Sequence, residues 1–187
     1  MTRITRRLAL AFIAAAGLAA PAFAQAPKEI RIDYATYNPV SLVLKERGIL
    51  EKALEADGIK VRWVLSAGSN KALEFLNAGS IDFGSTAGAA ALIGKINGNP
   101  IKSIYVYSRP EWTALVTGAK SEITKVSDLK GKRVAVTRGT DPHIFLVRAL
   151  LGVKLTEKDI TPVLLQHPDG KTALIRGDVD ALSLIHI

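Results

Sequence analysis

Loops rich in hydroxyl and amide side chains recur along this sequence, and each separates an apolar run from an amphipathic one. Four loops share this composition: Tyr37-Asn38-Pro39, Gly68-Ser69-Asn70, Ser85-Thr86-Ala87-Gly88 and Thr140-Asp141-Pro142-His143. Their hydroxyls, amides and bare backbone N–H groups can donate hydrogen bonds to an oxyanion, which has no proton to give back. Helix capping alone explains Ser, Thr or Asn at any one of these positions more simply. The ligand-binding interpretation therefore depends on the recurrence of such loops along the chain.

Catalysis is the alternative chemistry for the same residues. His143, His167 and His186 each have an aspartate nearby, but none shows metal-ligand spacing such as H-x-x-x-H, and no nucleophile-elbow sequence is present. The chain has no cysteine, which excludes a thiolate metal site, a cysteine nucleophile and a disulfide scaffold. We therefore expect a non-enzyme, with no catalytic residue, metal or cofactor. A neutral His143 at a helix N-terminus could instead donate one hydrogen bond to a ligand.

The elements that must position these loops alternate between short strands and helices. The predicted strands cover residues 29–36, 60–65, 81–84, 101–108, 113–117, 133–137 and 161–166. The predicted helices cover residues 40–47, 49–56, 71–78, 87–96, 142–151 and 169–176. This alternation predicts an α/β fold with mostly parallel strands. In such sheets ligands bind beyond the carboxyl ends of the strands, where helix N-termini present unpaired N–H groups.

Three helix starts have recognisable capping residues. Asp141 is the predicted N-cap of its helix, with Pro142 at the first helical position, because proline has no N–H to leave unpaired. Ser69 or Asn70 is the predicted N-cap of the helix after residue 65. Residues 156–159, Thr-Glu-Lys-Asp, resemble a capping box.

Composition and charge restrict the class of protein. The 187 residues are 48% hydrophobic, too apolar for a disordered chain, and include 25 Lys plus Arg against 17 Asp plus Glu. The basic residues are scattered among acids, and the densest group, Lys130, Lys132 and Arg133, reads as a solvated turn before a strand. We therefore expect no nucleic-acid partner.

The N-terminal 24 residues have the pattern of a signal peptide. Arg3, Arg6 and Arg7 form a positive region, an apolar run extends from Leu8 to Ala20, and residues 22–24 give the small-x-small cleavage pattern. The apolar run is shorter than the roughly 20 residues that a membrane span needs. We predict cleavage after residue 24 and export to the periplasm. The same N-terminus argues against the effector domain of a transcription regulator, which would carry a DNA-binding module there.

Several stretches carry a resemblance to a known family: residues 66–69 (SAGS), 76–84 (LNAGSIDFG), 126–135 (VSDLKGKRVA) and 177–181 (GDVDA). In this order they resemble the periplasmic substrate-binding proteins of ABC importers, in the branch for aliphatic sulfonates, taurine and nitrate. The similarity extends from Lys28 to Ala181. It identifies the superfamily and leaves the ligand open.

The resemblance implies a periplasmic-binding-protein-like fold of type II, with two α/β lobes and a cleft that traps a small organic anion. It places the first lobe at residues 25–108, a hinge crossing at Arg109, Pro110, Glu111 and Trp112, and the second lobe at residues 113–187. The implied ligand contacts are Tyr37, Asn38, Gly68, Ser69, Ser85, Thr86 and Gly88 in the first lobe, and Thr140 and His143 in the second. It also implies delivery to a membrane permease and its ATPase, and we expect a monomer.

Two features depart from the family pattern. Asp141 puts a carboxylate beside the expected anion site, so it either turns away as a cap, which we prefer, or indicates a ligand with a cationic part. Family members continue for roughly another hundred residues, so we expect the sequence to be truncated with an incomplete second lobe. An aliphatic sulfonate is the preferred ligand; nitrate, an aromatic sulfonate or a pyrimidine precursor of thiamine are alternatives, and a periplasmic enzyme is the weaker reading.

Overall fold

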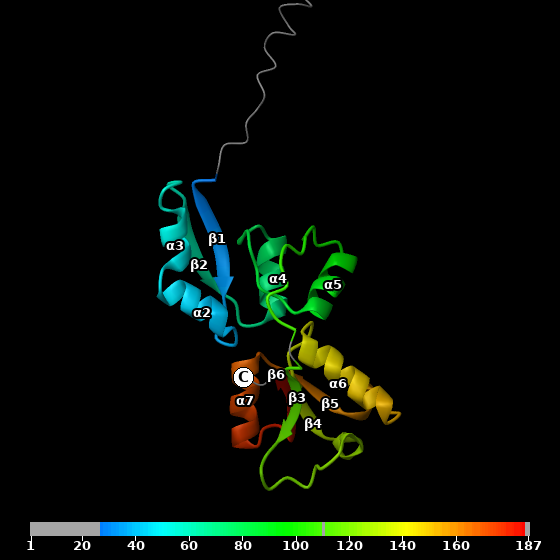
Figure 1. Ribbon diagram of the computed structural model, residues 1–187. Coiled ribbons are helices and arrows are strands. Elements are labelled where there is room, and N and C mark those ends of the chain that lie inside the picture. The colour runs from blue at the N-terminus through cyan, green and yellow to red at the C-terminus, as the bar shows by residue number, and fades with distance from the viewer. Residues whose placement is uncertain (1–26, 110, 186–187) are drawn as a thin grey trace, which may run out of the picture.

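The computed structural model describes residues 27–109 and 111–185, which form two α/β units connected by an extended segment (Figure 1). The predicted signal peptide, hinge residue Pro110 and the last two residues lie outside the described residues. Within the described ranges no helix is long and apolar enough to cross a membrane.

The first unit is built on two parallel strands. β1 (Glu29–Tyr34) pairs with β2 (Lys60–Leu65), with Ile32 opposite Trp63. Its helices are α2 (Pro39–Glu46), α3 (Ile49–Leu54), α4 (Ser69–Asn77) and α5 (Gly88–Ile96). A right-handed crossover through α2 and α3 is the ordinary way to connect parallel neighbours. The loop after each strand therefore lies at the carboxyl end of this small sheet.

The second unit has a four-stranded sheet in the order β3-β6-β4-β5, in which only β3 is antiparallel to its neighbour. Its strands are β3 (Thr113–Thr117), β4 (Arg133–Val136), β5 (Thr161–Leu164) and β6 (Ala181–Ile185). Its helices are the 3-10 turns η1 (Val126–Leu129) and η2 (Glu157–Asp159), with α6 (Asp141–Gly152) and α7 (His167–Arg176). The predicted capping box is present in η2, where Thr156 and Asp159 cap each other.

The second unit has two core layers, one on each face of β4, because alternate side chains of this strand point to opposite faces. Val134 and Val136 on one face of β4 pack with Leu146 and Leu150 of α6, all of them fully buried. Ala135, on the opposite face, packs with Ala173 of α7 and with β6. Because successive side chains of a strand point to opposite faces, each helix has a core layer of its own. α6 and α7 are thereby fixed on opposite faces of the sheet.

Two strand predictions were wrong. Residues 81–84 contribute only one bridge, between Phe83 and Ile32, because the chain leaves the ladder at Gly84 and the next amide, that of Ser85, bonds the side chain of Asp33. The predicted strand 101–108 forms no strand, and Tyr105 is 79% exposed. An alternating pattern needs a partner ladder to become a strand, and the described residues supply none there.

An arginine–aspartate clamp attaches the end of α4 to the first strand of its lobe. The guanidinium of Arg31 donates to both oxygens of Asp82, at 2.6 and 3.1 Å, and to the carbonyl of Gly79 at 2.6 Å. The backbone N–H of Arg31 also donates to the same carboxylate, at 2.8 Å. Gly79, at φ +64°, supplies the left-handed turn that ends the helix.

The second lobe repeats this clamp. Arg133, at the start of β4, donates to both oxygens of Asp180 at 2.8 and 3.2 Å and to the carbonyl of Gly177 at 2.9 Å. Gly177 has φ +79° and ends α7. The two segments share the pattern Gly-x-(Ile/Val)-Asp, at residues 79–82 and 177–180. The lobes are therefore built from one repeated unit of strand, helix, left-handed glycine and clamp.

The clamp predicts acid-sensitive stability. The hydrogen bond from Arg133 lowers the pKa of Asp180, so the pair stabilises the fold above the ordinary carboxyl pKa and loses that contribution as pH falls through the lowered value. Asp180→Asn keeps an acceptor and removes the charge. We expect its Tm to be a few degrees below wild type at pH 7, with a gap that closes towards pH 3 in thermal melts. The exposed Asp57→Asn is the control, and a gap that widens on acidification would contradict the prediction.

Candidate functional site

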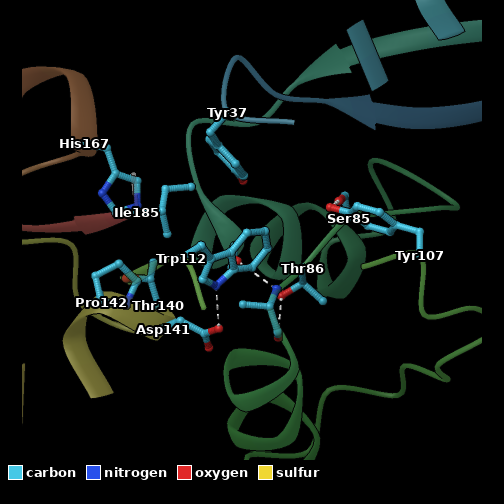
Figure 2. A pocket seen from close by; sticks show the side chains of 12 residues that line it. Tyr37, Ser85, Thr86, Tyr107, Trp112, Thr140, Asp141, Pro142, His167 and Ile185 are labelled. Atoms are coloured by element: carbon cyan, nitrogen blue, oxygen red, sulfur yellow. Dashed lines mark hydrogen bonds between the residues drawn. The ribbon is translucent and has the colours of Figure 1, made fainter. Parts of the chain in front are cut away.

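A pocket lies between the two lobes, where helix starts and strand ends from both converge (Figure 2). It encloses about 330 Å³ of space, part of which opens to solvent. The residues that line it are Tyr37, Ser69, Ser85, Thr86, Ala87, Tyr107, Trp112, Thr140, Asp141, Pro142, His167 and Ile185. Most of them directly follow a strand or begin a helix, as expected at the carboxyl edge of parallel sheets.

The starts of α4 and α5 form the first-lobe wall. Ser69, the first residue of α4, accepts a hydrogen bond at its Oγ from the N–H of Ala87, at 3.0 Å. This bond ties the two helix starts together and leaves the hydroxyl proton of Ser69 free to be donated. The N-cap of α4 is Gly68, so the prediction of Ser69 or Asn70 as the cap was wrong by one or two positions.

Asn38 supports this wall from behind. Its Oδ1 accepts from the N–H of Ser41 and caps α2, while its Nδ2 donates to Ser85 Oγ at 3.0 Å. Ser85 Oγ in turn lies 3.2 Å from the hydroxyl of Tyr107. Asn38 is 6% exposed and does not line the pocket. It therefore acts as a helix cap that also orients a pocket hydroxyl.

A buried carboxylate lies beneath the same loop. Asp33, in β1 and only 2% exposed, accepts from Ser66 Oγ at 2.5 Å and from the N–H of Ser85 at 2.8 Å. Burial raises the pKa of Asp33 more than these two bonds lower it, and the same burial, with Asp33 close by, raises the pKa of Tyr37. Asp33 thus joins the ends of β1 and β2 to the loop before α5. The sequence analysis missed it, because Asp33 shares the period-two face of Glu29 and Arg31 and therefore occupies an outward position in the strand pattern.

The second-lobe wall is the start of α6, and here the capping prediction was wrong. Thr140 is the N-cap of this helix, and Asp141 is its first residue. The hydroxyl of Thr140 donates to the carbonyl of Thr137 at 2.6 Å, so its proton is committed within the protein. The Nε1–H of Trp112 approaches Oδ2 of Asp141 at 3.4 Å, while Oδ1 is buried without a partner among the described residues (Figure 2). Asp141 therefore lines the pocket wall, with its Oδ1 closed to solvent.

His167, at the start of α7, is a pocket residue for which the sequence analysis predicted no ligand contact. Its Nδ1 lies 3.3 Å from Oγ1 of Thr137, which already donates its proton to the carbonyl of Leu165. Nδ1 must therefore be the donor, which leaves Nε2 as an acceptor. Burial lowers the pKa of His167 and favours the neutral ring. The loop between β5 and α7 follows the carboxyl end of a parallel strand, as the other four loops do, so the sequence pattern could have indicated His167 as a site residue.

Three more predicted contacts do not line the pocket. Gly68 is a close-packing position, because a Cβ there would lie 2.7 Å from Oδ1 of Asn70. Gly88 begins α5 and has open space around it. His143 pairs with Glu157 of η2 within the second lobe: its Nε2 lies 3.0 Å from Oε1 of that glutamate. The helix turn that carries Asp141 to the pocket thus leaves His143 paired within its own lobe.

The predicted crossing contributes directly to the pocket. Trp112 lines it and also packs on the cluster of Leu73, Ala87 and Ala90 in the first lobe. The rings of Tyr37 and His167 meet edge to face across the cleft, with centroids 6.3 Å apart. The other tryptophan, Trp63, donates to Glu51 and is a structural residue of the first lobe. No group of three His, Asp or Glu side chains in residues 27–109 and 111–185 is placed to hold a metal ion.

The family described as NMT1/THI5 like matches residues 54–186. The chain belongs to this NMT1/THI5-like family. A protein of Escherichia coli K12 named as an aliphatic sulfonates-binding protein is 32% identical over 179 residues, 95% of this chain and 56% of that protein.

Two solved structures agree with this assignment. The alkanesulfonate-binding protein SsuA from Xanthomonas axonopodis, bound to MOPS, matches at 31% identity and a TM-score of 0.77, over 85% of this chain and 55% of that one. The periplasmic aliphatic sulphonate binding protein SsuA from Escherichia coli matches at 32% identity and a TM-score of 0.65, over 86% and 52%. The chain spans about half the length of these relatives. The predicted family resemblance and the α/β periplasmic-binding-protein fold class are confirmed.

The burial of Asp33 predicts that its charge destabilises the fold. A carboxylate with a raised pKa costs stability as pH rises through that value, whereas the protonated form does not. Asp33→Asn keeps an oxygen for Ser85 N–H and gains a donor for Ser66. We expect a higher Tm than wild type at pH 7.5, by about 2 to 4 °C for each kcal/mol gained, and no advantage near pH 4. Thermal melts across this range test it; a variant that melts below wild type at pH 7.5 would show that the charge is needed.

Proposed function

We propose that this chain is the solute-binding component of an ABC importer that captures a small organic anion, preferably an aliphatic sulfonate, in the periplasm. It would deliver this ligand to a membrane permease and its ATPase. The relatives named for aliphatic sulfonates and for the periplasm support the proposal. Because those relatives are binding proteins, we infer capture without turnover.

The convergence of helix starts from both lobes on one pocket is the observation that carries the proposal. α4 and α5 start on one wall, and α6 and α7 start on the other. A helix start carries unpaired N–H groups and the positive end of the helix dipole, which favour an anionic group. Ser69 and Thr86 add hydroxyls on the first-lobe wall.

The rest of the lining favours an organic ligand over a bare inorganic ion. Tyr37, Tyr107 and Trp112 line the same pocket, and aromatic rings supply apolar contact area for a carbon chain. Nitrate has no such chain. We therefore keep the sulfonate as the proposed ligand, with the anionic group at the α4 and α5 starts and the chain against the rings.

The proposed lobe boundaries are residues 25–108 and 113–187, with residues 109–112 as the hinge. The extended run before Trp112 and the separate sheets on either side support this division (Figure 1). The edge-to-face contact of Tyr37 with His167 places the lobes close together, as in a closed cleft. Closure of two lobes around a ligand is a common hinge motion.

Removal of the wall hydroxyls tests the proposal. In calorimetric titration of the chain from residue 25 with propanesulfonate, we expect binding without product formation. Ser69→Ala and Thr86→Ala should each weaken it by roughly 1 to 3 kcal/mol, because a buried anion oxygen loses its donor. Thr86 Oγ1 must first give up its long bond to the carbonyl of Ala87, at 3.3 Å. The exposed Ser103→Ala is the matched control. Unchanged affinity in both wall variants would leave them as purely structural, while a folded chain that binds an aminopyrimidine and no sulfonate would replace the ligand class.

A further inference from the structure

The charge that the pocket can carry is set by few side chains. Among the described residues that line it, none is lysine or arginine, and His167 is the one histidine. The other ionisable side chains of this lining are tyrosines and Asp141, which carry a negative charge or none. The imidazole of His167 is therefore the only group in the described lining that can become positive. An anion held there meets no other side-chain charge of opposite sign.

His167 lies beside the wall at which the proposed function places the anionic group. It begins α7, and its ring centroid is 6.3 Å from that of Tyr37 in the first lobe (Figure 2). The preceding residue, Gln166, reaches the start of α4, since a Cβ at Gly68 would lie 3.5 Å from its Oε1. Charges that share such a pocket interact more strongly than charges in water, because the protein surroundings have a lower dielectric constant. A bound anion and the imidazole therefore affect each other.

The ring of His167 is arranged to receive a proton at Nε2. Its Nδ1 lies 3.3 Å from Oγ1 of Thr137, which donates its own proton to the carbonyl of Leu165 at 2.7 Å. Nδ1 is therefore the donor of the neutral ring, and Nε2 has the free lone pair. Burial lowers the pKa of His167 and keeps the ring neutral. A negative charge placed nearby favours the protonated ring and opposes this effect of burial.

Other titratable groups lie around the start of α7. Asp33 is buried in β1, and Asp141 stands at the start of α6. Protonation of either carboxylate in acid would also favour an anion, so the test has to separate them from the histidine. Arg138 is 62% exposed, and its guanidinium lies 4.0 Å from the carboxylate of Glu157. The titratable or charged side chains on the elements that adjoin His167 are Tyr37, Tyr107, Asp33, Arg138 and Asp141, with Asp169 and Lys171 on α7 itself.

We propose that the anion is captured together with a proton, which His167 takes up from solvent at Nε2 as the ligand binds. This inference rests on the proposed function, which supplies the anion. Coupling between two bound species is reciprocal, so the anion raises the proton affinity of the ring and the proton raises the affinity for the anion. Binding is then tighter in acid. The gain is lost as pH rises through the value at which the ring of the complex releases its proton.

The pH dependence of binding tests this inference. The chain from residue 25 is titrated calorimetrically with propanesulfonate between pH 5.5 and 8.5, in buffers that contain no sulfonate and so do not compete. Wild type should bind at least about fivefold more tightly at pH 5.5 than at 8.5, within the limit of about tenfold per pH unit for one coupled proton. In His167→Asn the affinity should change by less than about twofold, because no proton is then coupled. The amide introduced there can still donate to Thr137, as Nδ1 does.

Matched variants identify the titrating group. His143→Asn removes a histidine that pairs within the second lobe, outside the pocket, and His186→Asn removes the remaining histidine of the chain. Both should keep the wild-type pH dependence. Asp33→Asn and Asp141→Asn, which remove the two carboxylates, should keep most of it. Loss of the dependence in any of these four variants, or its persistence in a folded His167→Asn, would overturn the inference.

A second measurement follows the ring itself. The NMR signals of the His167 imidazole are titrated with pH, with and without saturating propanesulfonate, and their absence in His167→Asn assigns them. The midpoint should lie at higher pH when the anion is bound, because the bound charge favours the protonated ring. An unchanged midpoint, or wild-type binding that does not vary with pH, would contradict the inference and leave the proposed function standing. Failure of propanesulfonate to bind at any pH would instead reject the proposed function.

Discussion

The arginine–aspartate clamp is the interaction on which the arrangement of each lobe depends. It joins a backbone N–H and a guanidinium of one strand, β1 or β4, to one carboxylate, and the guanidinium also donates to the carbonyl of the glycine that ends a later helix, α4 or α7. The clamp sits at the amino end of the strand, remote from the pocket. By fixing helix and strand there, it sets where the opposite end of the strand, and hence the loop that follows it, emerges.

Asp33, near the carboxyl end of β1, has the opposite electrostatic role. The clamp aspartates are partly exposed and paired with arginine, which lowers their pKa, whereas Asp33 is buried with neutral donors, which leaves its pKa raised. The clamp therefore stabilises through its charge, and Asp33 holds the Ser85 loop despite its charge.

Much of this arrangement could be predicted from the sequence. Period-two alternation, glycine stops and hydroxyl-rich loops located most helices and strands and the pocket residues Tyr37, Ser69, Ser85, Thr86 and Thr140. The sequence did not reveal which segments far apart along the chain pair with one another. Residues 101–108 have the alternation of a strand yet lack a partner ladder, and Phe83 makes a single bridge because the following amide bonds Asp33. Contacts such as Ser85 with Tyr107, 22 residues apart, exist only once the first lobe is folded.

The one-residue error at the start of α6 has the largest consequence for function. Asp followed by proline is a strong N-cap pattern. The carboxylate of an N-cap aspartate accepts hydrogen bonds from the backbone N–H groups in the first turn of its own helix. Here Thr140 takes the cap position and commits its hydroxyl to Thr137, so Asp141 moves into the first turn with no capping bond to make. Its Oδ2 then accepts only a long bond, at 3.4 Å, from the indole N–H of Trp112, and its Oδ1 is buried without a partner among the described residues. A shift of one position thus moves Asp141 from the predicted helix cap to a place on the pocket wall.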